Sequence, residues 1–311
     1  MKKTLFILLI VFNISNVNAQ QISNLNLDLL KSGEQELTPH AVEIIQGTEA
    51  NNRIISDSIF VKNWVKLLKT KKSFYYPFDS LITISRIYAP DSSFRIFTWQ
   101  LVIDENNVRQ HGAIQMNTAD GSLKLFPLID RSDVIENIAD TITSNLAWVG
   151  AIYYKLIEKV YKKEKYYTLI GYDENNIRST KKIIEVLHFK DGSPIFGGGY
   201  FLIPNDEIKP HYPARYIMEY KKDASPKLNF DVEMNMIVME HMISESNEPA
   251  KAWTMIGDGD YDGLKWKGGR WVLVPKIFDQ IIPEGKAPTP MPIRDAKGTI
   301  DDTKLKQTNP Q

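Results

Sequence analysis

Apolar and polar residues alternate with a period of two along much of the chain from about residue 80 onward. Phe97, Trp99 and Leu101, for example, fall on one face of an extended segment. This period predicts β-strands with one buried and one solvated face. The turn-forming stretches between the segments are short, and short connections join antiparallel neighbours. We therefore predict a mainly β fold, an antiparallel meander or sandwich of about 10–14 strands, over residues 80–283 as one domain or two sub-sheets.

Several strands and turns can be placed within this region. Residues 228–238 show the most regular alternation in the chain. They predict one long strand, which we expect to pair with a strand at 215–220. Asp191-Gly192 and Gly268-Gly269 are compositions typical of two-residue turns, and each predicts a β-hairpin.

The segment 148–160 is compatible with two structures. Its apolar residues fit a helical stripe, but it is also rich in Ile, Val and Tyr, which favour strands. We favour a strand that pairs with 166–172 across the charged sequence Lys162-Lys163-Glu164-Lys165. A helix at 148–160 stays as the alternative.

The period changes to that of a helix near residue 60. Four apolar residues recur at i, i+3, i+4 and i+7, the spacing of one helical face: Val61, Trp64, Val65 and Leu68. We predict one amphipathic helix at about 57–69 that packs on the sheet. The rest of 20–79 reads as an irregular segment, with a short helix near Leu25 that ends at Gly33.

The first 19 residues have the order of a secretory signal peptide. Lys2 and Lys3 precede an apolar run, and small residues lead up to Ala19. The run is too short to span a bilayer. We predict a signal peptide over 1–19, cleavage after Ala19, and a mature protein that is periplasmic or secreted. The later sequence holds no apolar stretch long enough for a membrane-spanning helix, so we predict no transmembrane anchor after cleavage.

Composition narrows the class of protein further. The chain contains no cysteine, which excludes disulfides, thiolate metal sites and a lipid-modified cysteine. An exported chain that needs no disulfide is typical of a bacterial periplasm or exterior. Basic and acidic residues balance at 38 each, so we expect no nucleic-acid partner.

Residues 284–311 are polar and rich in proline, and they predict a disordered tail.

The sequence Asp258-Gly259-Asp260-Tyr261-Asp262-Gly263 is the best candidate for a metal site. Alternating Asp with Gly at the sixth position begins like a calcium loop, whose first, third and fifth side chains converge on the ion. We therefore name Asp258, Asp260 and Asp262 as candidate Ca²⁺ ligands. Gly269 stands where the bidentate Glu should be. The alternative is a polar turn in which Asp and Gly satisfy backbone groups.

Trp266 and Trp271 follow this acidic sequence closely. Exposed aromatic rings in an exported protein can stack on sugars, so we name both as candidate ligand-binding residues. The histidines are scattered, and neither a zinc motif nor a serine hydrolase elbow occurs. The sequence therefore predicts no catalytic residue, and no cofactor other than the candidate Ca²⁺.

Together these features favour an exported, non-catalytic β protein that binds or supports a component of the cell envelope or exterior. Two other functions stay open: a glycan-binding module, with or without calcium, and a hydrolase that no motif reveals. A glycan binder requires an exposed Trp266 or Trp271 ring beside Asp258 and Asp262. A hydrolase requires a deep cleft with close, desolvated carboxylates.

Overall fold

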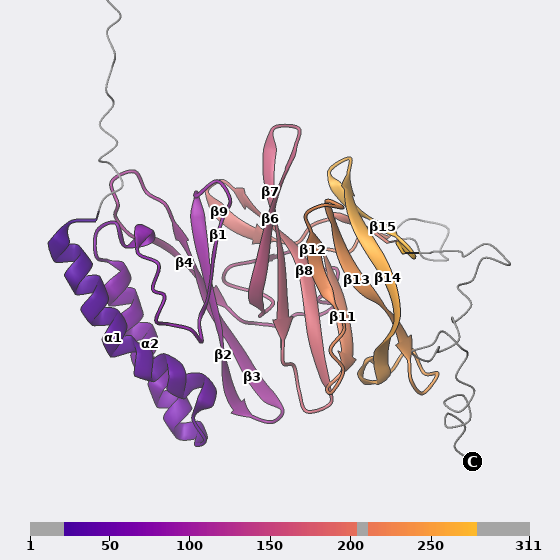
Figure 1. Cartoon of the computed structure of the whole chain (residues 1–311), viewed down its shortest axis with the longest axis horizontal. Helices are drawn as coiled ribbons and strands as arrows, with labels where there is room; N and C mark the ends of the chain where they lie inside the picture. Colours follow the sequence, from indigo (N-terminus) through magenta and orange to yellow (C-terminus); the bar gives the residue numbers. More distant parts are fainter. Residues whose placement is uncertain (1–21, 204–210, 279–311) are drawn as a thin grey trace, which may run out of the picture. The chain divides into compact units, whose positions relative to one another are not determined.

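The structure is a computed structural model that describes residues 22–203 and 211–278. The predicted signal peptide over 1–19 and the predicted tail over 284–311 lie outside these residues. Within the described ranges, the chain up to Ile277 forms one compact unit of three β-sheets and a pair of helices (Figure 1). The prediction of a mainly β, largely antiparallel fold is confirmed. The described residues contain 15 strands.

Two packed helices, α1 (Asn24–Gln46) and α2 (Ala50–Leu68), form the described N-terminal region, where the sequence predicted one helix at 57–69. The predicted apolar stripe lies in α2, which begins earlier than expected. α1 continues through Gly33, where the sequence predicted an end. A Cβ at Gly33 would lie 2.5 Å from the Leu67 side chain. This glycine therefore lets the helices approach each other and does not terminate α1.

The first sheet is four-stranded, antiparallel and ordered β1-β2-β3-β4. Both helices pack on β2, and their buried residues share a core with Phe97, Trp99 and Leu101. The apolar face that alternation predicted for β2 is thus buried by the two helices. The strands are β1 (Ser85–Tyr88), β2 (Phe94–Asp104), β3 (Asn107–Met116) and β4 (Lys124–Ile129).

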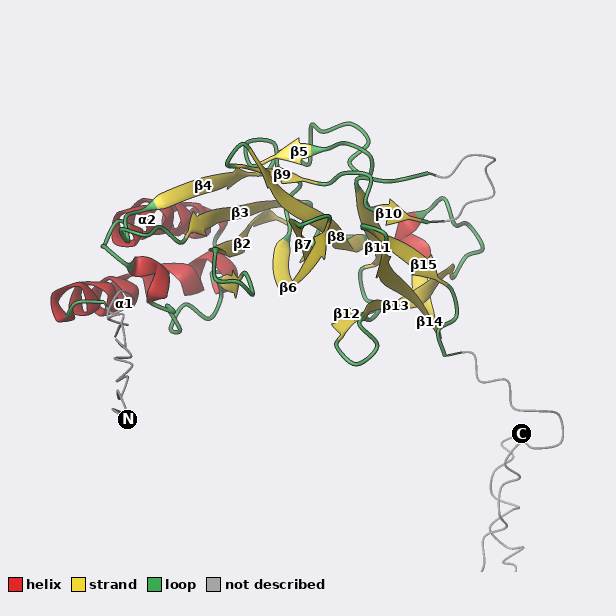
Figure 2. Cartoon of the chain, turned by 90° about the horizontal axis from the view of Figure 1, so that it is seen from above, coloured by secondary structure: helices red, strands yellow, loops and turns green. Residues whose placement is uncertain are grey.

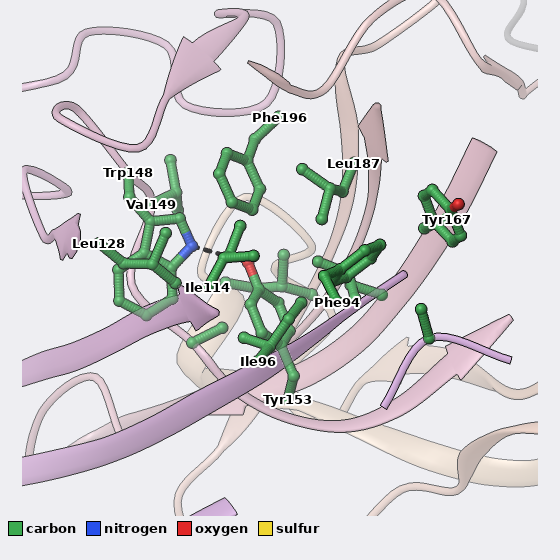
Figure 3. Close-up of a cluster of buried hydrophobic side chains, with 14 residues drawn as sticks. Phe94, Ile96, Ile114, Leu128, Trp148, Val149, Tyr153, Tyr167, Leu187 and Phe196 are labelled. Carbon is green, nitrogen blue, oxygen red and sulfur yellow. Dashed lines mark hydrogen bonds between the residues drawn. The ribbon is translucent and has the colours of Figure 1, made fainter. Parts of the chain in front are cut away.

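The second sheet has six strands in the order β5-β9-β8-β7-β6, with β11 also paired to β8. Its core with the first sheet includes Phe94, Ile96, Ile114, Trp148 and Tyr153 (Figure 3). The preference for a strand over a helix within 148–160 is confirmed, because β6 pairs with β7. The strands are β5 (Thr143–Ser144), β6 (Ile152–Tyr161), β7 (Glu164–Asp173), β8 (Ser179–Lys190), β9 (Ser193–Phe196) and β11 (Arg215–Lys221).

The third sheet is five-stranded, in the order β10-β15-β14-β13-β12, and lies on the side of the second sheet away from the helices (Figure 2). A third core, which includes Ile184, Leu264 and Trp271, joins these two sheets. β10 and β15 pair in parallel. The strands are β10 (Phe201–Leu202), β12 (Leu228–Asp231), β13 (Met236–Ser244), β14 (Met255–Lys267) and β15 (Arg270–Val274).

The prediction of one long strand at 228–238 is wrong. The chain turns between β12 and β13, and the two strands pair with each other. The Met234 backbone N–H donates to Asp231 Oδ1 at 2.8 Å, and Asn235 has a φ of 50°. Val232, predicted to be buried, is 74% exposed. The expected partner at 215–220 is β11, which pairs with β8 instead.

Candidate functional site

A groove of about 650 Å³ opens between α2 and the helix-side face of β3 and β4. It arises because the helices pack over β2 and leave part of the neighbouring strands uncovered. On α2, lining positions one helical turn apart face the groove. We call it the α2–β4 groove, and its lining residues fall within 57–62 of α2, Trp99 of β2, 109–112 of β3 and 127–131 at the end of β4.

Asp57 and His111 meet in the α2–β4 groove. Only 8% of the Asp57 side chain is exposed, and its Oδ1 accepts a hydrogen bond from Trp99 Nε1 at 2.9 Å. The same oxygen lies 3.2 Å from Nδ1 of His111, whose side chain is 31% exposed. A carboxylate in this position favours the imidazole tautomer with its proton on Nδ1. The Nε2 atom of His111 is then available to a ligand.

Asp130 shapes the β4 end of the groove. Its Oδ1 accepts hydrogen bonds from the backbone N–H and the hydroxyl of Ser132, at 2.9 and 2.7 Å. Its Oδ2 accepts from the Gln110 backbone N–H at 3.0 Å. These three donors engage the carboxylate and hold the turn that carries Arg131. The Arg131 backbone N–H donates to the Trp148 carbonyl at 2.9 Å, so the turn is anchored on the core.

Trp148 is itself held by a buried polar network. Its Nε1 donates to the Tyr153 hydroxyl at 2.7 Å, and that hydroxyl in turn donates to Glu185 (Figure 3 shows the first of these bonds). Burial and the Glu185 carboxylate raise the pKa of Tyr153 well above its ordinary value. Glu185 is paired with Arg215 at 3.1 Å, and both side chains are fully buried. The β4 end of the groove therefore rests on a fixed core.

The basic side chains of the groove differ in whether the protein neutralises them. Arg109 Nη2 lies 2.8 Å from Asp133, and this hydrogen bond raises the pKa of Arg109 and lowers that of Asp133. The side chains of Lys62 and Arg131 are exposed and make no hydrogen bond or ion pair with a described residue. The groove's carboxylates are thus occupied by protein donors, whereas two of its cations are open to an anion.

Apolar side chains complete the lining of the groove. Val61 on α2 is 36% exposed, and Ile129 at the end of β4 is 38% exposed. Pro127 lies beside them in the lining. Ligand sites of this size usually combine an apolar surface with a few placed polar groups. The arrangement suits a small molecule with an apolar body and one acidic group.

The groove offers little for nucleophilic chemistry. Among the described residues that line it, the one hydroxyl belongs to Ser58. Ser58 Oγ donates to the Ile54 carbonyl at 3.0 Å, a bond within α2. His111 could act on water, with Asp57 orienting its ring.

The predicted calcium residues lie on β14, at an irregularity in its pairing with β13. Asp258 Oδ2 lies 2.8 Å from His241 Nδ1, and this contact lowers the pKa of Asp258. Asp262 accepts a hydrogen bond from the Lys276 backbone N–H at 2.9 Å. Asp260 is exposed. In the described ranges, no group of three or more acidic or histidine side chains is arranged to hold a metal. Calcium binding stays a prediction, and a melting temperature unchanged by EDTA would count against it.

The two predicted tryptophans have different environments. Trp271 is fully buried, and its Nε1 donates to Thr168 Oγ1 at 2.9 Å. Its ring presents no face to a sugar in solvent. Trp266 is half-buried against Trp271 and Tyr166, with ring centroids 5.4 and 6.1 Å away. Its place as a ligand-binding residue stays a prediction.

Sequence reasoning did not find the groove residues. Asp57, His111 and Arg131 are far apart along the chain, and none belongs to a motif. One signal was present in β3: Arg109 and His111 share a strand face that is directly paired with the apolar face of β2, where Trp99 lies opposite His111. Charged residues on β3 beside the fully apolar face of β2 indicate that the layer covering β2 does not extend over this part of β3.

Comparison with family models, with curated proteins and with solved structures finds no match for this chain. Within the described ranges, no helix has both the length and the apolar composition needed to cross a bilayer.

Proposed function

We propose that this chain is an exported, non-catalytic binding protein of the cell envelope or exterior, and that the α2–β4 groove binds a small organic anion with an apolar body. The observation that carries the proposal is the contrast between the groove's charges. Asp57 and Asp130 are engaged by protein donors, while Lys62 and Arg131 are left open to an anion.

The binding mode follows from the lining. The acidic group of the ligand lies between Lys62 and Arg131, and His111 Nε2 adds a further polar contact. The apolar body covers Val61 and Ile129, which removes exposed apolar surface from water. Because Asp130 and Asp57 are already hydrogen-bonded, a ligand does not need to neutralise them.

The test uses two fluorescent dyes that differ mainly in charge, anilinonaphthalene sulfonate and uncharged phenylnaphthylamine. We expect the sulfonate to bind the parent protein more tightly. Lys62→Gln combined with Arg131→Gln should weaken sulfonate binding about 10-fold, since two partly exposed charge contacts together contribute roughly 1.4 kcal/mol. Binding of the uncharged dye should not change.

The matched control is Lys69→Gln combined with Lys71→Gln, which removes two exposed charges just beyond α2, outside the groove lining. This variant should bind the sulfonate as the parent does. Equal affinity of the parent for both dyes, or an equal loss in the control, would refute the groove as an anion site.

Export is proposed on the N-terminal pattern. Expression of the full chain in a bacterium that has a periplasm should give a mature protein whose first residue is Gln20. A product that keeps Met1 and stays in the cytoplasm would contradict this part of the proposal.

The Asp57–His111 pair favours one second candidate, a hydrolase in which His111 activates water. Chromogenic nitrophenyl esters and phosphates are suitable probes. This candidate requires turnover above background that is lost in His111→Gln and kept in His40→Gln. Absence of turnover with the parent protein would refute the hydrolase candidate, and the binding function would then be the one that is kept.

A further inference from the structure

Three hairpins within the described residues turn through two consecutive residues with left-handed φ. The β8–β9 turn uses Asp191-Gly192, at 51° and 75°, and the β14–β15 turn uses Gly268-Gly269, at 60° and 82°. Such residues accept this conformation readily. The β6–β7 turn places Lys162-Lys163 there instead, at 49° and 71°. A side chain with a Cβ is disfavoured at both positions, so the chain keeps two lysines at a cost in stability.

These lysines stand at the end of a hairpin that extends beyond the neighbouring strands (Figure 1). Both are exposed, and Val160 beside them is 58% exposed. Tyr161 lies against the β14–β15 turn, because a Cβ at Gly269 would be 2.5 Å from its ring. That contact brings exposed Lys267 to the same end of the molecule.

Two acidic groups near this end, Asp91 and Glu158, share one lysine. Lys165 lies 2.5 Å from Asp91 and 3.1 Å from Glu158. Glu164, the first residue of β7, is acidic and exposed. The side chains of Lys163 and Lys267 make no ion pair or hydrogen bond with a described residue. We name Val160, Tyr161, Lys162, Lys163 and Lys267 the basic tip.

We propose that the basic tip docks on the surface of an anionic phospholipid bilayer. Lysines near such a surface are attracted by its negative potential. Tyrosine is favoured at the boundary between lipid and water, and an exposed valine gains from contact with lipid. A soluble polyanion would use the charges but would have no use for Val160. This site is separate from the α2–β4 groove and does not depend on the proposed groove ligand.

The test combines vesicle binding with thermal stability. Lys162→Asn with Lys163→Gly installs the residues that this turn prefers. The variant should melt roughly 2 to 6 °C higher than the parent, because it relieves two left-handed lysines. It should nevertheless bind phosphatidylglycerol vesicles about 25-fold more weakly, roughly fivefold for each lysine removed. A more stable protein that has lost binding cannot be explained by misfolding.

Two further variants serve as controls in a vesicle sedimentation assay. Lys162→Arg with Lys163→Arg keeps the charge and should keep binding. Lys69→Gln with Lys71→Gln removes two charges elsewhere and should also bind as the parent does. Vesicles of phosphatidylcholine alone should bind poorly.

Several outcomes would overturn the proposal. These are equal binding to phosphatidylglycerol and phosphatidylcholine, an equal loss in the Lys69 and Lys71 control, and a melting temperature that does not rise in the Asn-Gly variant. Binding to heparin without binding to vesicles would assign the tip to a soluble polyanion. Failure of any of these tests leaves the dye-binding result for the groove unaffected.

Discussion

The buried Glu185–Arg215 pair offers the sharpest test of the core that supports the groove. Both side chains are 0% exposed, with Arg215 Nε 3.1 Å from Glu185 Oε2. Arg215 also donates to the Thr141 carbonyl at 2.8 Å and to Thr143 Oγ1 at 3.2 Å. Glu185→Gln removes the negative charge, keeps the side-chain volume and leaves the guanidinium buried without a counter-charge.

The expected cost follows from this burial. Removing one partner of a buried ion pair costs about 3–5 kcal/mol, because the remaining charge cannot be solvated. For a domain of this size that corresponds to a melting temperature lower by roughly 6 to 20 °C. The Tyr153 hydroxyl links Glu185 to Trp148, so we also expect weaker near-ultraviolet circular dichroism from the tryptophan.

Urea denaturation followed by fluorescence measures this free energy of unfolding. The matched control is Glu245→Gln, which breaks a pair with Lys221 of similar length, 2.9 Å, between side chains 50% and 37% exposed. That exposed pair should contribute little to the free energy of unfolding. Adding Arg215→Met to Glu185→Gln removes the stranded charge and should recover part of the loss. Equal effects of Glu185→Gln and Glu245→Gln would refute the buried pair.

Three more predictions concern pH and packing. Burial raises the pKa of Asp173, so the folded state holds this proton more tightly and stability is lost as pH rises through the carboxyl range. Asp173→Asn should therefore be more stable than the parent at about pH 7 and gain less at about pH 3, as measured by urea denaturation. Burial alone would raise the pKa of Asp91, but hydrogen bonds from Lys165 and other donors outweigh it and hold the pKa well below its ordinary range. That stability is present above a pH of about 4 and is lost as pH falls towards the folded-state pKa, so Asp91→Asn should cost more at about pH 6 than at about pH 2. A Cβ at Gly150 would lie 2.5 Å from the Gln110 side chain, so Gly150→Ala should cost about 1–3 kcal/mol and weaken sulfonate dye binding in the groove.

Alternation along the chain was enough to predict much of the sheet structure. The two hairpins at Asp191-Gly192 and Gly268-Gly269 form as expected, because the turn residues and the flanking alternation agree. The error at 228–238 has a specific cause. Alternation alone does not distinguish one long strand from two strands joined by a turn, and Asp231 and Asn235, the residues that form the turn, also occupied polar positions of the pattern.

The helical region shows a different limit. Gly33 suggests a helix end when seen in sequence, yet it lies inside α1, as does Pro39. Gly33 is tolerated because it allows close packing on Leu67, a contact that no local pattern contains.

The groove was missed for a related reason. It forms where the helix pair stops covering the first sheet, and the extent of that cover depends on tertiary packing.

The ring of His111 gives the most direct test of the groove. Long-range nitrogen–proton correlation spectra, assigned with His111→Gln, report its tautomer and its response to anilinonaphthalene sulfonate. We predict that neutral His111 carries its proton on Nδ1, towards Asp57, and that its ring signals shift on dye binding while those of His40 do not. A proton on Nε2, or dye binding that leaves the His111 signals unmoved, would contradict the account.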